Sequence, residues 1–102
     1  MNSPRREDDT MAEIIETGFE GRAHGTIVRT GDGKTARYYL VSSALTPDHG
    51  YETMVFSFNA KKRAVIDWAE KYVERYNTNS AMEYGHERVC KHLEEYLKRH
   101  VN

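Results

Sequence analysis

His86 and Cys90 are the pair of side chains in this sequence whose spacing best suits chemistry. Residues four apart on a helix share a face, so an imidazole and a thiolate at these positions can converge on one metal ion. A tetrahedral site needs more ligands, however, and these would have to come from His24 or His49 elsewhere in the chain. We favour a small buried cysteine beside a hydrogen-bonded core histidine, and predict no metal site and no cofactor. A metal-binding protein built on His86 and Cys90 is kept as a further alternative.

Two other sequence features bear on catalysis, and neither is complete. Cys90 falls in the middle of a predicted helix, away from the helix N-terminus that commonly lowers a thiol pKa. The segment Gly31-Asp32-Gly33-Lys34 lacks the spacing of a phosphate loop and the Ser or Thr that follows its lysine. We therefore predict no catalytic residues and a protein that is not an enzyme.

The residues best suited to binding a partner are a run of cations and two tyrosines. Lys61-Lys62-Arg63 is the densest basic patch of the chain, although such a run also suits a solvated turn. Tyr39 and Tyr51 fall in predicted strands, where an exposed ring can stack on a base or anchor a protein, and a packed ring only supports the sheet. The predicted partner-binding site consists of Lys61, Lys62, Arg63, Tyr39 and Tyr51.

The charges are balanced and spread along the chain. The 102 residues include 15 Lys and Arg against 16 Asp and Glu, for a net charge of -1. Neither half shows the basic stripe that phosphate binding requires, nor the acidic block of a nucleic-acid mimic. No apolar run approaches the roughly 20 residues of a membrane span, so we expect no membrane association. A single cysteine excludes an internal disulfide and fits a reducing compartment.

The elements that would position these residues begin after a polar leader. Residues 1–12 are charged and aperiodic, which predicts a disordered leader ahead of a single domain over residues 13–102. Ile14 and Ile15 suit a short strand, but glycines follow closely and we expect an irregular segment there.

The strand pattern predicts a small antiparallel sheet. Segments 26–30 and 35–42 flank an Asp-Gly pair, which is typical of a hairpin with a type I′ turn. Residues 51–58 form the next predicted strand, on which alternation places Met54, Phe56 and Phe58 on one face. Residues 64–76 fit either a helix or a return strand beginning at Ala64, and spacing alone leaves both open.

The C-terminal segment has the clearest helical pattern. Apolar residues recur at spacings of three and four over residues 80–99, and Thr78 or Asn79 can cap the helix start. We expect an α+β fold in which a small antiparallel sheet of three to four strands packs against this long C-terminal helix. The apolar trio of the 51–58 strand should then meet Val89, Leu93 and Leu97.

A string of residues in the second half of the chain resembles a family. Tyr51-Glu52-Thr53-Met54-Val55-Phe56 is followed, in order, by Trp68-Ala69-Glu70, Glu74-Arg75-Tyr76, Thr78 and Gly85-His86. This arrangement resembles small uncharacterised proteins of bacteriophages and prophages, over roughly residues 51–97. The resemblance implies a strand–turn–strand–helix unit, which favours a strand over residues 64–68. It also implies a mobile-element origin and action in the host cytoplasm, and it supplies no biochemical activity.

Together these features lead us to expect a non-catalytic accessory protein of phage or prophage type. It would bind a host or phage macromolecule, in a regulatory or anti-defence role, and the partner expected first is a protein. The alternative is a small nucleic-acid-binding module that uses Lys61-Lys62-Arg63 and exposed tyrosines. A homodimer is also compatible, because a small sheet with aromatic bulk on both faces would gain from a dimer interface.

Overall fold

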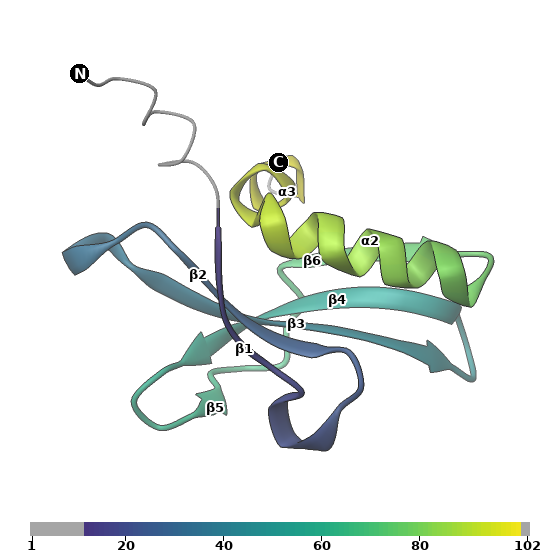
Figure 1. Ribbon diagram of the computed structural model, residues 1–102, viewed down its shortest axis with the longest axis horizontal. Coiled ribbons are helices and arrows are strands. Elements are labelled where there is room, and N and C mark those ends of the chain that lie inside the picture. The colour runs from purple at the N-terminus through teal and green to yellow at the C-terminus, as the bar shows by residue number, and fades with distance from the viewer. Residues whose placement is uncertain (1–11, 101–102) are drawn as a thin grey trace.

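The computed structural model describes residues 12–100, in which a sheet carries two helices on one face (Figure 1). The leader predicted for residues 1–12 therefore lies outside the described residues, apart from Ala12. The backbone N–H of Ala12 donates a hydrogen bond to the carbonyl of Lys91 at 3.1 Å. This bond joins the start of the described chain to the end of the first long helix.

The sheet is antiparallel throughout and has six strands within residues 12–100, more than the three to four predicted. Five strands follow in the order β1-β2-β3-β4-β5, and β6 pairs with β4 as well. The strands are β1 (Glu13–Thr17), β2 (Gly25–Thr30), β3 (Arg37–Thr46), β4 (Gly50–Asn59), β5 (Ala64–Val65) and β6 (Tyr72–Tyr76). The fold class α+β with an antiparallel sheet is confirmed, and the strand number is corrected.

The first additional strand is β1, where an irregular segment was expected. Gly18 and Gly21 have positive φ of 71° and 76° and shape the turn η1 (Phe19–Gly21) after β1 instead of interrupting it. A bulge between Ile14 and Glu16 lets the short strand follow β2.

The β2–β3 connection is longer than the type I′ turn predicted for it. Thr30 pairs with Arg37, so six residues form the loop, and η2 (Gly33–Thr35) is a 3-10 turn within it. Gly31 has φ of 69°, and a Cβ there would lie 2.7 Å from the carbonyl oxygen of Thr35. The glycine is thus needed for the chain to close on itself here.

The ambiguous segment 64–76 forms strands and no helix. β5 pairs with the end of β4, at Phe58 and Asn59. β6 pairs with the first half of β4, from Tyr51 to Val55. The two short strands therefore lie along the same side of β4, one after the other.

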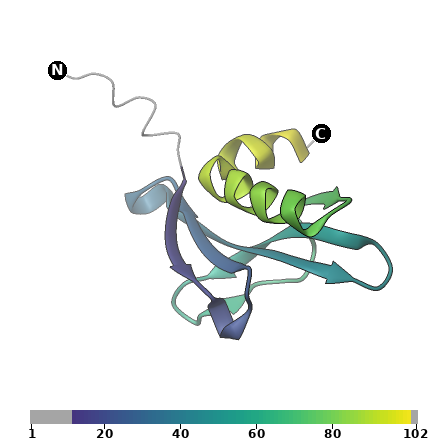
Figure 2. The same cartoon turned by 45° about the vertical axis from the view of Figure 1, so that its right-hand side comes forward.

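The predicted helix over residues 80–99 is two helices, α2 (Asn79–Lys91) and α3 (Leu93–His100). Thr78 caps α2 as expected, since its hydroxyl accepts a hydrogen bond from the Ala81 N–H at 3.1 Å. His92 leaves the helical conformation with φ of -121°, and α3 turns away from the axis of α2 (Figure 2). Neither helix is long and apolar enough to cross a membrane.

The sheet buries an apolar cluster on each face. The cluster beneath the helices contains Val28, Val41, Val55, Val89, Cys90, Leu93 and Tyr96. The cluster on the opposite face contains Phe19, Ile27, Leu40, Phe56 and Phe58. The predicted contact of Met54, Phe56 and Phe58 with Val89, Leu93 and Leu97 is therefore wrong. Val55 takes that place, because neighbouring residues of a strand point to opposite faces.

Candidate functional site

The helix-covered face holds a buried chain of hydrogen-bonded polar side chains. The Nε2 atom of His86 lies 2.9 Å from the Thr26 hydroxyl, and its Nδ1 atom lies 2.6 Å from the Ser43 hydroxyl. The Ser43 oxygen is 2.5 Å from that of Thr53, which accepts a hydrogen bond from the Tyr76 hydroxyl at 3.0 Å. We call these five residues the polar core network. Each member forms a hydrogen bond with its neighbour, and these bonds replace the bonds to water that polar groups lose on burial.

The Ser43–His86 contact has the distance of a nucleophile and its base, but its environment does not suit catalysis. Burial, with the nearby His24 as a smaller cause, lowers the pKa of His86 to about 4. General bases work best with a pKa near the operating pH, so His86 is a weak base at neutrality. Its second nitrogen meets the Thr26 hydroxyl, where a triad would place a carboxylate. The contact forms part of the hydrogen-bonded packing between α2 and the sheet.

The His86 and Cys90 pair does not have the environment of a metal site. Both ring nitrogens of His86 already contact hydroxyl groups. Burial raises the pKa of the Cys90 thiol to about 12, and metals bind the thiolate. Across the part of the chain that the structure describes, no group of three or more His, Cys, Asp or Glu side chains can hold a metal ion.

Gly85 explains how the network closes against α2. A Cβ at this position would lie 2.4 Å from the ring and hydroxyl of Tyr76. The glycine therefore lets the Tyr76 ring approach the helix, while His86 beside it reaches Ser43. The Gly-His pair of the predicted helix thus acts in packing.

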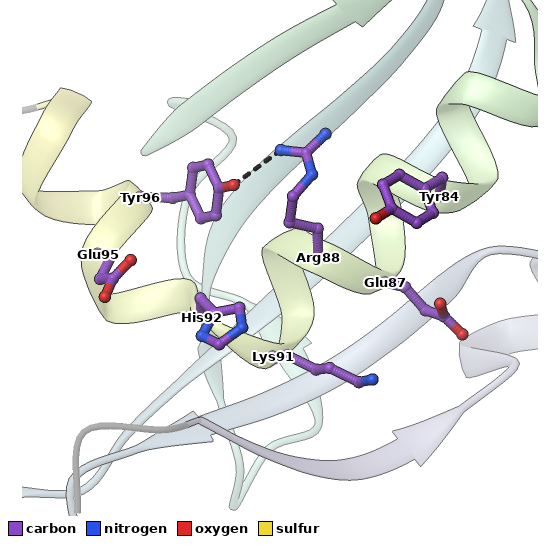
Figure 3. A pocket seen from close by; sticks show the side chains of 7 residues that line it. All are labelled: Tyr84, Glu87, Arg88, Lys91, His92, Glu95 and Tyr96. Atoms are coloured by element: carbon purple, nitrogen blue, oxygen red, sulfur yellow. Dashed lines mark hydrogen bonds between the residues drawn. The ribbon is translucent and has the colours of Figure 1, made fainter. Parts of the chain in front are cut away.

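A second feature is a pocket on the outer surface of α2 and α3, which Figure 3 shows. At its centre the Arg88 guanidinium donates to the Tyr96 hydroxyl at 2.7 Å and to the Glu74 carboxylate at 2.9 Å. The Arg88 guanidinium also lies 5.7 Å from the Tyr96 ring centre. These contacts join α2 to α3 and to β6, so Arg88 chiefly holds these three elements together.

Arg63 is the least free member of the predicted basic patch. Lys61 and Lys62 are exposed in the turn between β4 and β5. The Arg63 guanidinium, by contrast, pairs with both oxygens of Glu16 at 2.9 and 3.0 Å. It also lies 5.5 Å from the centre of the Phe19 ring. Arg63 therefore fastens β1 and η1 to this turn, whereas the two lysines are exposed.

The structure does not bring the two predicted tyrosines together. Tyr39 pairs with Ser57 and packs against the helix-covered cluster, and burial raises its pKa. Tyr51 begins β4, whereas the lysines follow its end. At about 3.3 Å per residue, a strand of this length separates Tyr51 from Lys61 by tens of ångströms.

A pocket of about 370 Å³ lies where β3 begins and β4 ends, next to the lysine turn. We call it the loop-end pocket. Its lining residues are Ala36, Arg37, Tyr38, Tyr39, Ser57, Phe58, Asn59, Ala60 and Ile66. Ile66 is 62% exposed, a fraction similar to those of Leu45 and Trp68. Of the predicted binding residues, the pocket includes Tyr39 and adjoins Lys61.

Sequence reasoning missed Arg37 and Ile66, and it left Tyr38 out of the predicted binding site. They became neighbours through the β3–β4 register, which sets Tyr38 opposite Phe58, and through β5, which returns Ile66 to Ser57. Register depends on loop length, and the β3–β4 loop is shorter than expected, since β3 continues to Thr46 and β4 begins at Gly50. The chain matches no family model, no curated protein and no solved structure with which this site could be compared.

Proposed function

We propose that the protein is a non-catalytic binding module that acts through the loop-end pocket and the adjoining lysines. The supporting observation is how its polar groups are distributed. The groups with reactive chemistry, His86 and Cys90, are buried, whereas exposed cations and an exposed Ile66 gather at one end of the sheet. Contiguous apolar surface rimmed by polar residues is typical of interaction sites, and in this pocket Ile66 lies with Ala36 and Ala60 beside Arg37.

The biological setting belongs to the same proposal. On the resemblance to small phage and prophage proteins, we propose an accessory protein that acts in the cytoplasm of an infected or lysogenic bacterium. Its partner would be a protein of the host or the phage, in a regulatory or anti-defence role. The observation in favour of the nucleic-acid alternative is that Lys61 and Lys62 are exposed in the β4–β5 turn.

Affinity capture with matched variants tests the proposal. The full chain and an Ile66→Asp variant would each be immobilised and exposed to bacterial lysate, with and without nuclease. We expect the wild type to retain a protein that Ile66→Asp does not retain. Tyr84→Asp is the control, since Tyr84 is also exposed but lies on α2. No retained macromolecule, together with turnover of a small molecule, would overturn the proposal; retention lost to nuclease would favour nucleic acid.

A further inference from the structure

The topology gathers cations at one end of the sheet. Two connections far apart in the sequence leave the sheet there, the β2–β3 loop with residues 31–36 and the β4–β5 turn with residues 60–63. They come close where Arg37 and Ala60 line the same pocket. Both connections lie on the left of Figure 1. Segments 31–37 and 60–63 together contain the cations Lys34, Arg37, Lys61, Lys62 and Arg63 and the acid Asp32, and the Glu16 carboxylate from β1 pairs with Arg63. A chain with a net charge of -1 is therefore locally basic at this end.

Arg37 stands out among the arginines of the described chain. Five others in residues 12–99 pair with carboxylates, namely Arg22, Arg29, Arg63, Arg75 and Arg88. Arg99 lies over the Tyr96 ring, 4.6 Å from its centre. Arg37 is exposed, lines the loop-end pocket and pairs with no carboxylate in residues 12–99. An arginine that the fold leaves unpaired is well suited to a carboxylate from a partner.

The rest of the pocket suits an apolar side chain. Ala36, Phe58, Ala60 and Ile66 contribute carbon atoms to its wall. Its volume of about 370 Å³ lies within the range of sites that hold small ligands, and is ample for one or two side chains. An apolar wall beside an unpaired arginine and two lysines matches a peptide that carries both an apolar residue and acids.

The aromatic residues favour a peptide over a nucleic acid. Tyr38 packs against the cluster on the face of the sheet opposite the helices, which we call the open face. Tyr39 packs against the cluster beneath the helices. Both rings are half-buried by this packing, which reduces the ring surface on which the bases of a single strand could stack. The unpaired cations are also too few for the strong electrostatic term that phosphate binding uses.

We propose that the loop-end pocket docks an extended acidic segment of a partner protein. An apolar side chain of the segment enters the pocket, and flanking Asp or Glu residues meet Arg37, Lys61 and Lys62. This inference rests on the proposed function and names the chemistry of the partner. Because the charges are exposed, the affinity should fall as salt is raised from 0.05 to about 0.5 M, where the Debye length becomes shorter than the contact region.

Selection from a library of random 12-residue peptides on the immobilised full chain tests this inference. We expect the enriched peptides to carry a Leu, Ile, Phe or Met flanked by Asp or Glu. Their affinity, measured by fluorescence anisotropy, should fall at least tenfold with Arg37→Glu. It should change less than twofold with Lys98→Glu, an equal charge change on exposed α3.

Several outcomes would overturn the inference. The first three are that no peptide is enriched, that the enriched peptides are basic or uncharged, or that Arg37→Glu and Lys98→Glu reduce the peptide affinity equally. The fourth is that a 12-nucleotide oligo-dT binds more tightly than the peptides and also requires Arg37. If the inference fails while Ile66→Asp still abolishes capture of a protein from lysate, the proposed function stands with a partner of different chemistry. If that capture is also absent, both fail. Circular dichroism of each variant verifies that it is folded.

Discussion

The two faces of the sheet are built differently, and β4 shows both. Its Thr53 and Val55 point toward the helices, Thr53 within a hydrogen-bonded network and Val55 within a small aliphatic cluster. Phe56 and Phe58 point to the opposite face, where they pack with Phe19 of η1 and Val65 of β5. Neither α2 nor α3 lies on that face (Figure 2). Burial of the helical face depends on matched polar partners as well as on apolar area.

The difference has a physical reason in the side chains involved. Phe19 from η1 meets Phe58 edge to face, with ring centres 5.2 Å apart, and Trp68 meets Phe56 at 4.9 Å. Large rings can thus be enclosed by a few other rings. Thr26, Ser43 and Thr53 are small, and leave room for α2 to approach closely and insert His86 between them. The position of α2 therefore depends on hydrogen bonds as well as on apolar packing, whereas the open face depends on aromatic packing.

The largest effect should come from removing an aromatic ring of the open face. Phe56→Ala would empty a site that is 5% exposed and take away the ring that contacts Trp68. We expect the free energy of unfolding to fall by about 3–5 kcal/mol, measured by urea denaturation. Ser57→Ala, on the same strand but facing the other way, is the control and should cost far less. A loss below about 1 kcal/mol for Phe56→Ala would mean that the open face is not a core.

The second effect is acid sensitivity of the helix-covered face. The pKa of His86 is lowered from 6.5 to about 4 by burial, so the unfolded chain binds its proton more readily. Stability from this group is present above pH 6.5 and lost as pH falls toward 4, by up to roughly 3 kcal/mol. Urea midpoints measured at several pH values should show this loss.

Variants separate His86 from other titrating groups. His86→Gln should be less stable at pH 7, yet should lose little more between pH 6.5 and 4.5. Glu16 and Glu74 have lowered pKa values and contribute mainly below their ordinary value of 4.5. If His24→Gln flattens the pH dependence instead, the sensitivity belongs to His24 and not to the polar core network.

The comparison of faces also shows what the sequence could and could not reveal. The α+β class and the helical start at Thr78 followed from periodicity and capping, which are local. The face of β4 that packs against the helices could not be predicted in this way, because the large apolar side chains of Met54, Phe56 and Phe58 favoured the other face. Burial of Thr53 and Ser43 depends on partners from α2, which no local pattern reveals.

Local sequence patterns also revealed only part of the candidate site. Lys61 and Lys62 were found as a charge run, and the structure leaves them exposed. Arg37 and Ile66 were not found, since they become neighbours only through strand register and the return of β5. Whether an arginine is paired depends on where the folded chain places the carboxylates, and no local sequence pattern gives those positions.

The third effect should come from Gly85→Ala, and its sign is diagnostic. In an ordinary helix interior this change stabilises by about 0.5–1 kcal/mol. Here the new methyl group would lie 2.4 Å from the Tyr76 ring, so we expect a destabilisation of about 1–3 kcal/mol, measured by thermal and urea unfolding. In a Tyr76→Ala background the penalty should disappear. A stabilising Gly85→Ala in the wild-type background would contradict the close approach of Tyr76 to α2.

The smallest effect should come from Trp68→Ala, which sharpens the comparison within the open face itself. Trp68 is 61% exposed although its ring contacts Phe56, which is 5% exposed. Most of its surface remains in water, so we expect a loss on the order of 1 kcal/mol, mainly from the ring pair. A double-mutant cycle with Phe56→Leu isolates that pair, with an expected coupling of about 0.5–1.5 kcal/mol in urea denaturation. A loss from Trp68→Ala as large as that from Phe56→Ala would mean that Trp68 is a core residue, and that the open face is sealed more tightly than its exposure indicates. A small loss would instead show that this face tolerates change at its surface while depending on the ring beneath.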